Sequence, residues 1–279
     1  MAVVLITGCS SGFGMLAAVE FARRGDAVYA SMRDTLKSGP LLDEAKAAGV
    51  SVHVIPLDVT NAASVKDAVA GVTAREGRID VLVNNAGVGM HGPVEEAEDD
   101  EAHALFETNV FGLLRVTRAV VPHMRAQGGG AIVNVSSLAG KVSSPFGGLY
   151  SATKHAVEAL SDALYFELHP FGVRVAVVEP GGFETRFGDN RMIERNFNAA
   201  SPYADLERRF AERQTRLPGT GERSDASDVA RVIVDAATAE QPRRRYLVGK
   251  DAELIGGFHK QMSDEDFERA MRTALDFWD

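Results

Sequence analysis

The sequence is very poor in cysteine: Cys9 is the only one among 279 residues. A single cysteine excludes an intramolecular disulfide and any metal site built from several cysteines. Such sparing use of cysteine is typical of proteins in a reducing compartment, so we expect the protein to be cytoplasmic.

Long apolar runs and an excess of positive charge are also missing. The apolar run Ala2 to Ile6 is too short for the core of a signal peptide, and we expect neither a targeting segment nor a membrane span. Lys and Arg number 30 against 39 Asp and Glu, which gives a net charge of -9. This field repels phosphate backbones and anionic lipid headgroups, so we expect no nucleic-acid or membrane partner.

What the chain does contain is typical of a globular enzyme-sized domain. Hydrophobic residues make up 45% and charged residues 25%, and the sequence shows no repeat, low-complexity tract or internal linker. We therefore expect a single domain over residues 1–279.

Short β-branched runs alternate with longer segments of helical period along most of the sequence. This alternation predicts a doubly wound (Rossmann) α/β fold, with a parallel sheet of about seven strands and helices on both faces. The predicted strands are Ala2 to Thr7, Ala27 to Met32, Ser51 to Pro56, Val81 to Asn84, Ala131 to Ser136, Arg174 to Glu179 and Arg245 to Val248. The clearest predicted helices are Phe13 to Arg24, Ala62 to Glu76, Asp100 to Gln127 and Gly148 to His169.

One segment breaks the alternation after the sixth predicted strand. Residues Gly182 to Ser224 form a long polar and aromatic insertion with a helical stretch near Leu206 to Arg216. Because ligands bind at this end of such sheets, we predict that about residues 187–221 form a helical lid.

The first chemical signal is a glycine-rich loop, Thr7 to Gly14, between the first predicted strand and helix. Glycines let a backbone turn sharply and approach a pyrophosphate, and the N–H groups of a helix start bind its negative charge. A tight turn with no ligand is the alternative interpretation of this loop alone. The predicted cofactor contacts here are Gly8, Ser10, Ser11, Gly12, Phe13 and Gly14.

Three further motifs follow in order along the chain. Asn84-Asn85-Ala86-Gly87 ends the fourth predicted strand, Ser137 ends the fifth, and Tyr150-Ser151-Ala152-Thr153-Lys154 comes thirteen residues later. Together with the TGxxxGxG loop, this set resembles the short-chain dehydrogenase/reductase family, over about Ala2 to Thr185. Within it, segments such as Val28-Tyr29-Ala30 and Pro145-Phe146 resemble the type-1 17β-hydroxysteroid dehydrogenase branch.

The resemblance implies specific roles for residues at matching positions. It implies that Asn109 holds a water in a proton relay, that Lys154 also bonds the nicotinamide ribose, and that the helices at 100–127 and 148–169 form a homodimer or homotetramer. The remaining cofactor contacts that it implies are Asp58, Val59, Asn85, Ala86, Gly87, Pro180, Gly181 and Thr185.

Tyr150 and Lys154 are four residues apart, so on a helix they project from one face. An ammonium favours a neighbouring phenolate, so we expect Lys154 to lower the pKa of Tyr150. Hydride exchange between a nicotinamide and a carbonyl needs a proton donor or acceptor and one more hydrogen bond to the oxygen. These roles suit Tyr150 and Ser137 without any metal.

The expected substrate is a bulky hydrophobic ketone or secondary alcohol. The predicted apolar pocket residues are Leu138, Val142, Phe146, Phe183 and Phe187. Two alternatives stay open: a 3-oxoacyl-carrier-protein reductase, and a non-enzymatic dinucleotide-sensing regulator on the same fold.

The end of the second predicted strand favours NADP(H) over NAD(H). An NAD-selective site places a carboxylate there, whereas this chain has Met32 followed by Arg33, whose guanidinium can bind a 2′-phosphate. Ser11 can add a hydroxyl donor. In the alternative, Asp34 bends back to take the carboxylate role and NAD(H) binds.

Several other polar residues have ordinary interpretations. The histidines are scattered and predict no metal site, although His91 is expected at the rim of the pocket. The acidic run Glu95 to Glu101 complements a helix dipole, and Arg243-Arg244-Arg245 is interpreted as a solvated edge. Cys9 is expected to be a small apolar filler.

Overall fold

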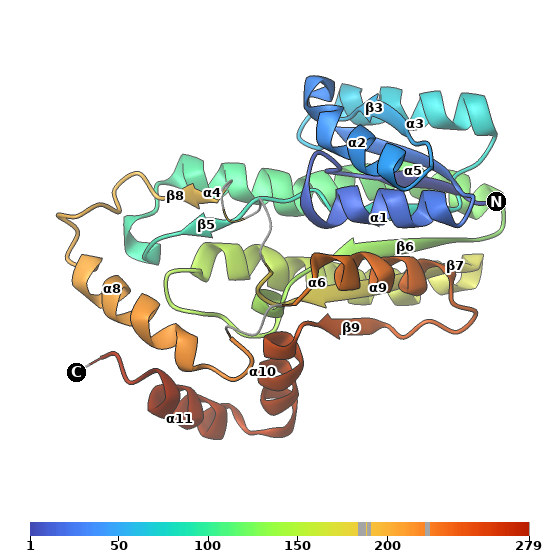
Figure 1. Cartoon of the computed structure of the whole chain (residues 1–279). Coiled ribbons are helices and arrows are strands. Elements are labelled where there is room, and N and C mark those ends of the chain that lie inside the picture. The colour runs from blue at the N-terminus through green and yellow to red at the C-terminus, as the bar shows by residue number, and fades with distance from the viewer. Residues whose placement is uncertain (184–187, 189–190, 221–223, 279) are drawn as a thin grey trace.

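The computed structural model describes residues 1–183, 188, 191–220 and 224–278. Its centre is a seven-stranded, all-parallel sheet in the order β3-β2-β1-β4-β6-β7-β9 (Figure 1). The strands are β1 (Val3–Ile6), β2 (Ala27–Met32), β3 (His53–Pro56), β4 (Val81–Asn84), β6 (Gly130–Val135), β7 (Val173–Pro180) and β9 (Arg245–Val248). Every predicted strand is present, and the predicted doubly wound fold is confirmed.

Helices cover both faces of the sheet, and each face has its own apolar core. One core packs α1 (Gly12–Arg23), α2 (Gly39–Ala47) and α9 (Ala226–Thr238) on the strands. The other packs α3 (Ala62–Glu76), α5 (Gly112–Ala126) and α6 (Gly148–Leu168). Strands buried on both sides need continuous apolar runs rather than alternation, which is why all four residues of β1 are buried.

The long helix predicted over 100–127 is interrupted. It consists of α4 (Asp99–Phe106), one π-helical turn (Glu107–Phe111) and α5. Such π turns occur mostly as single turns inside α-helices, and they are frequent at functional sites. This turn carries Asn109, whose side chain is buried.

A second layer lies beyond the carboxyl ends of the strands. There β5 (Met90–His91) pairs with β8 (Met192–Ile193), followed by α8 (Ala204–Arg213), and the chain ends in α10 (Lys250–Gln261) and α11 (Asp264–Leu275). Figure 1 shows α8 and α11 next to each other in this layer. Phe210 of α8 packs against Phe277, with ring centroids 5.3 Å apart and ring planes tilted by 59°. The C-terminal tail therefore supports the helix of the insertion.

The strand order reverses between β1 and β4, with β2 and β3 on one side and β6, β7 and β9 on the other. Open α/β sheets bind ligands in the crevice at such a switch point. The loops that follow β1, β4, β6 and β7 converge there, and they carry the glycine loop, Asn85, Ser137 and Pro180-Gly181. Tyr150 and Lys154 lie on α6. Across the described ranges, no helix is both long and apolar enough to cross a bilayer.

Candidate active site

A cavity of about 800 Å³ opens at the carboxyl ends of the strands. Sixteen of the predicted site residues line it, from the glycine loop through to the end of β7. They are Gly8, Ser10, Ser11, Gly12, Phe13, Arg33, Asp58, Val59, Asn85, Ala86, Gly87, Ser137, Tyr150, Lys154, Pro180 and Gly181. Gly14 and Asn109 support lining residues instead, and Thr185 lies outside the described residues.

The glycine loop is packed tightly against the loop after β4. Gly8 has φ +74°, and a Cβ there would lie 2.8 Å from the Cα of Ala86. At Gly14 a Cβ would lie 2.3 Å from Nδ2 of Asn85, so both positions exclude a side chain. The Ser11 side chain does not cap the first turn of α1, and Gly12 and Phe13 face the cavity. Backbone N–H groups of this turn therefore remain for an anion such as a pyrophosphate.

The loop after β4 is braced on β1 by hydrogen bonds. Asn85 donates from Nδ2 to the carbonyl oxygens of Thr7 (2.9 Å) and Gly8 (3.0 Å). The Thr7 hydroxyl accepts from the backbone N–H groups of Asn85 and Ala86, both at 3.0 Å. Asn84 points into the core and donates to Asn134 Oδ1 at 2.9 Å. These residues fix the shape of the cleft rather than form a loose turn.

The end of β2 presents an arginine, not a carboxylate, to the cavity. Arg33 is exposed and lines the cavity beside Met32. The Asp34 carboxylate is already engaged, because it accepts from the backbone N–H of Leu36 at 3.0 Å and caps a 3-10 turn. Asp58, at the end of β3, accepts from the backbone N–H and the hydroxyl of Thr60 at 2.9 and 2.7 Å.

Ser137, Tyr150 and Lys154 line the part of the cavity wall that is formed by α6 and the loop after β6. Ser137 Oγ accepts from the N–H of Ala139 at 3.1 Å and lies 3.4 Å from the carbonyl oxygen of Pro180. Lys154 Nζ donates to the carbonyl oxygen of Val135 at 2.9 Å and lies 5.7 Å from the centre of the Tyr150 ring. The spacing on α6 thus places the phenol and the ammonium in one site, as predicted.

Asn109 connects the π turn to the loop after β4. Its amide nitrogen donates to the carbonyl oxygen of Val88 (2.9 Å) and to Thr153 Oγ1 (3.1 Å), while its oxygen accepts from the N–H of Val88 (2.9 Å). A Cβ on Gly87 would lie 3.3 Å from Asn109 Oδ1 and 3.7 Å from Lys154 Nζ. Asn109 and Lys154 therefore both flank Gly87, and the amide nitrogen and oxygen of Asn109 are both hydrogen-bonded.

Burial shifts the pKa values of Tyr150 and Lys154 in opposite directions. It raises the pKa of Tyr150 to about 12, and a hydrogen bond with Ser137 offsets only part of this rise. Burial also lowers the pKa of Lys154 to about 8, against the opposing charge of Glu158. The predicted lowering of the Tyr150 pKa is wrong for this site, because desolvation of the phenolate is the larger effect. Tyr150 keeps its proton at neutral pH and can donate it.

The substrate side of the cavity is largely apolar. Of the predicted pocket residues, Leu138, Val142 and Phe183 line it, whereas Phe146 packs in the apolar cluster with Phe210. The prediction for Phe187 falls outside the part of the chain that the structure describes. The cavity also takes in side chains that no motif marked, namely Phe210 of α8, Leu217 in the segment after α8, Ile255 of α10 and Met271 of α11.

His91 faces this cavity, as expected. Its Nε2 lies 2.9 Å from Oε1 of Glu207 on α8, and its ring is 6.0 Å from that of Phe146. Burial lowers the pKa of His91, although the Glu207 carboxylate opposes the effect. The pair lies in a part of the wall that also holds the polar side chains Arg191 and Gln214.

The acidic run at 95–101 does more than complement a helix dipole. Glu98 and Glu101 form a capping box on α4. The same segment also binds the insertion: Glu96 accepts from Ser201 (2.8 Å), Glu98 from Asn196 (2.6 Å) and Glu101 from the N–H of Arg195 (3.0 Å). Its second role, which the sequence interpretation missed, is to hold the insertion beside the cavity.

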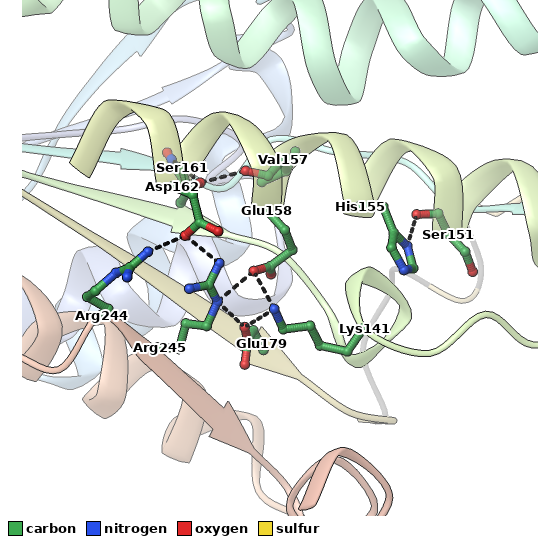
Figure 2. A network of polar contacts seen from close by, with 11 residues as sticks. Lys141, Ser151, His155, Val157, Glu158, Ser161, Asp162, Glu179, Arg244 and Arg245 are labelled. Carbon is green, nitrogen blue, oxygen red and sulfur yellow. Dashed lines mark hydrogen bonds and ion pairs between the residues drawn. The ribbon is translucent and has the colours of Figure 1, made fainter. Parts of the chain in front are cut away.

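The interpretation of Arg243-Arg244-Arg245 as a solvated edge is confirmed for Arg243, which is exposed beside the edge strand β9, and is wrong for Arg244 and Arg245. Arg245 lies between acidic side chains of α6 and β7, and Arg244 bonds Asp162 (Figure 2). A run of basic residues carries no local sign of such partners, because they come from segments more than 60 residues away. Throughout the ranges that the structure describes, no group of His, Cys, Asp or Glu side chains could hold a metal ion.

Fold and site together define a dinucleotide-binding oxidoreductase of the Rossmann class. Residues 2–196 match the family described as short chain dehydrogenase, and the chain belongs to that family. Its members are NAD(P)-dependent dehydrogenases and reductases, so this protein is an enzyme of that kind, and a nicotinamide dinucleotide is its cofactor.

Individual known proteins are similar to this chain in sequence and structure over most of its length. The chain is 41% identical over 203 residues to 3-ketodihydrosphingosine reductase of Bacteroides thetaiotaomicron, covering 73% of this chain and 72% of that one. It is 38% identical over 254 residues to estradiol 17-beta-dehydrogenase 1 of Rattus norvegicus, covering 88% and 73%. A short chain dehydrogenase/reductase of Burkholderia phymatum, solved in complex with NAD, is 30% identical, with a TM-score of 0.79 and coverage of 96% and 95%. The resemblance to 17β-hydroxysteroid dehydrogenases is confirmed.

Proposed function

We propose that the protein interconverts a bulky hydrophobic ketone and its secondary alcohol, with NADP(H) as the preferred cofactor. The observation that carries this proposal is one continuous cavity. Its polar end is the glycine loop, and its centre holds Ser137, Tyr150 and Lys154. Its far wall contains large apolar side chains, such as Phe210 and Ile255, together with the polar pair His91 and Glu207. The residues fit the cofactor, since the uncapped start of α1 suits a pyrophosphate and Arg33 suits a ribose phosphate.

Each of the site's side chains has a distinct task in this proposal. The nicotinamide, when bound, supplies or accepts the hydride. Ser137 holds the substrate oxygen with a hydrogen bond, and Tyr150 gives that oxygen its proton in reduction and takes it back in oxidation. Lys154 stabilises the phenolate that remains, because its ammonium lies near the ring. Hydrogen bonds between Asn109 and Val88 hold the π turn against the loop that contains Gly87, which lies beside Lys154.

The preference for NADP(H) rests on the end of β2. The carboxylate that would take the adenine ribose hydroxyls in an NAD site has one candidate here, Asp34, and that side chain already caps a turn. Arg33 stands exposed at the cavity instead. This arrangement supports the phosphate-binding role of Arg33.

The apolar wall supports the substrate class. Phe183, Phe210 and Ile255 come from three different segments to line it, so a large hydrophobic body can be enclosed. The names of two relatives, a 3-ketodihydrosphingosine reductase and an estradiol dehydrogenase, fit a lipid-sized substrate.

The test is a substrate panel with NADPH oxidation as the readout. It contains long-chain aliphatic ketones, steroid ketones, short ketones and a 3-oxoacyl thioester, each also assayed with NADH. We expect kcat/KM to rise with apolar size. Turnover confined to the thioester would support a 3-oxoacyl-carrier-protein reductase instead.

A further inference from the structure

Six charged side chains form a cluster on and around α6 (Figure 2). It holds three acids and three bases from four segments: Glu158 and Asp162 on α6, Glu179 on β7, Lys141 after the Ser137 turn, and Arg244 and Arg245 at the start of β9. None of these residues takes part in the mechanism above. The cluster nevertheless touches each element that carries a catalytic group.

Glu158 is at the centre of this cluster and is almost fully buried, with 5% of its surface exposed. Its Oε2 lies 3.0 Å from Nε of Arg245 and 3.2 Å from Nζ of Lys141. Removing one partner of such a buried pair leaves an uncompensated charge, so a buried carboxylate persists only when it is paired in this way. Glu158 therefore forms an ion pair with each of the two cations.

Glu179 is the second buried carboxyl of the cluster, with 2% exposed. The same two cations lie farther from it, Arg245 at 3.2 Å and Lys141 at 3.7 Å. Burial and the neighbouring charge of Glu158 raise the pKa of Glu179 well above its usual range. A side-chain hydrogen bond with Glu158 acts in the same direction, so the two carboxyls lie together beside one pair of cations.

Lys154 is one helical turn before Glu158 on α6, and 6% of it is exposed. Its ammonium donates to the Val135 carbonyl and lies 5.7 Å from the centre of the Tyr150 ring, and both of these groups are uncharged. Burial alone drives an ammonium to lose its proton. Glu158 is the acidic side chain that opposes this loss.

We propose that Glu158 is a positioning residue whose buried carboxylate, fixed by Lys141 and Arg245, keeps Lys154 protonated in the working pH range. The proposal rests on the catalytic role of Lys154 proposed above. Glu158 acts through Lys154 and touches neither cofactor nor substrate.

The direct test is the titration of Lys154 by NMR in protein labelled at the lysine Cε, which needs no cofactor. The sequence has seven lysines, and Lys154→Met assigns the signal. The wild-type midpoint is expected at about 8. Glu158→Gln keeps the shape and removes the charge, and we expect it to lower the midpoint by about one pH unit, at the small end of the range for a nearby opposite charge.

The matched control is Glu179→Gln, which removes a carboxylate from the same cluster and should leave the Lys154 midpoint in place. Glu158→Asp, which keeps the charge, should restore most of the shift. An unchanged midpoint in Glu158→Gln overturns the proposal, and so does an equal shift in Glu179→Gln. If Glu158→Gln does not fold, Glu158→Gln with Lys141→Met removes both charges of one pair and is judged by the same two results.

The activity readout separates this proposal from the proposed function. The alkaline limb of kcat should move down by about one pH unit in Glu158→Gln, with near-normal kcat well below pH 7. If Lys154→Met retains full turnover, the catalytic role of Lys154 fails, whereas the NMR titration still decides whether Glu158 controls its proton.

Discussion

Arg33 offers the sharpest test of how the protein selects its cofactor. The substitution Arg33→Ala removes an exposed guanidinium at the cavity and leaves the Asp34 cap on Leu36 intact. Because the side chain makes no core contact, the fold should survive. The effect should therefore fall on the 2′-phosphate alone.

The magnitude follows from the kind of contact. A hydrogen bond to a charged group contributes about 1.5 to 3 kcal/mol, and exposure places Arg33 at the lower end. With about 1.4 kcal/mol for each factor of ten, kcat/KM for NADPH should fall about 10- to 30-fold. The value for NADH should change less than about twofold, since its ribose carries no phosphate for the lost charge to bind.

The assay compares kcat/KM for both cofactors with one ketone in wild type, Arg33→Ala and Arg24→Ala. Arg24 is also exposed and precedes β2, whose six residues span about 20 Å. That separation exceeds the screening length of about 8 Å at physiological salt, so Arg24→Ala controls for net charge. A wild type that already prefers NADH, or an Arg33→Ala variant with the wild-type ratio, refutes the reasoning.

Three further outcomes are expected. Hydrogen exchange in residues 191–220 should slow when NADPH and a ketone are added. The polar contacts that hold this segment, such as Ser201 with Glu96, are individually weak, so the segment opens easily without ligand. Exchange that is already slow and does not change on adding ligand would contradict the lid hypothesis. Light scattering should give a dimer or tetramer rather than 29.9 kDa, since Phe111 and Phe166 stay exposed on the helices expected to pair; a monomer at micromolar concentration contradicts this. Cys9 should resist iodoacetamide at pH 8 until the protein unfolds, because complete burial raises its pKa and keeps the thiol protonated; rapid alkylation of the native protein would show that the loop opens.

The sequence predicts the positions of the cavity-lining residues best where each directly follows a parallel strand. Gly8, Asn85 and Ser137 each follow a parallel strand, and parallel strands bring their carboxyl ends to one edge. The i,i+4 spacing of Tyr150 and Lys154 needs only a helix to become a pair. Local patterns were therefore sufficient for these residues.

What the sequence did not reveal depends on contacts between distant segments. Arg245 lies next to Glu158 and Glu179 because β9 pairs with β7. Phe210 contacts Phe277 because the C-terminal tail packs on α8. The pKa of Tyr150 depends on how much water the finished site excludes, which spacing does not encode. The π turn at Asn109 likewise has no periodic signature within the helical pattern.

The proton-transfer role of Tyr150 is the central claim, and one variant tests it most directly. Tyr150→Phe removes a single hydroxyl, and Tyr165→Phe, on the same helix and away from the cavity, is the matched control. Single-turnover NADPH oxidation with the best ketone should slow by about 10² to 10⁴ in Tyr150→Phe, the usual contribution of a general acid, with NADPH binding by fluorescence unchanged. Tyr165→Phe should match wild type. A Tyr150→Phe enzyme that keeps most of its single-turnover rate would contradict the assignment of Tyr150 as the proton donor.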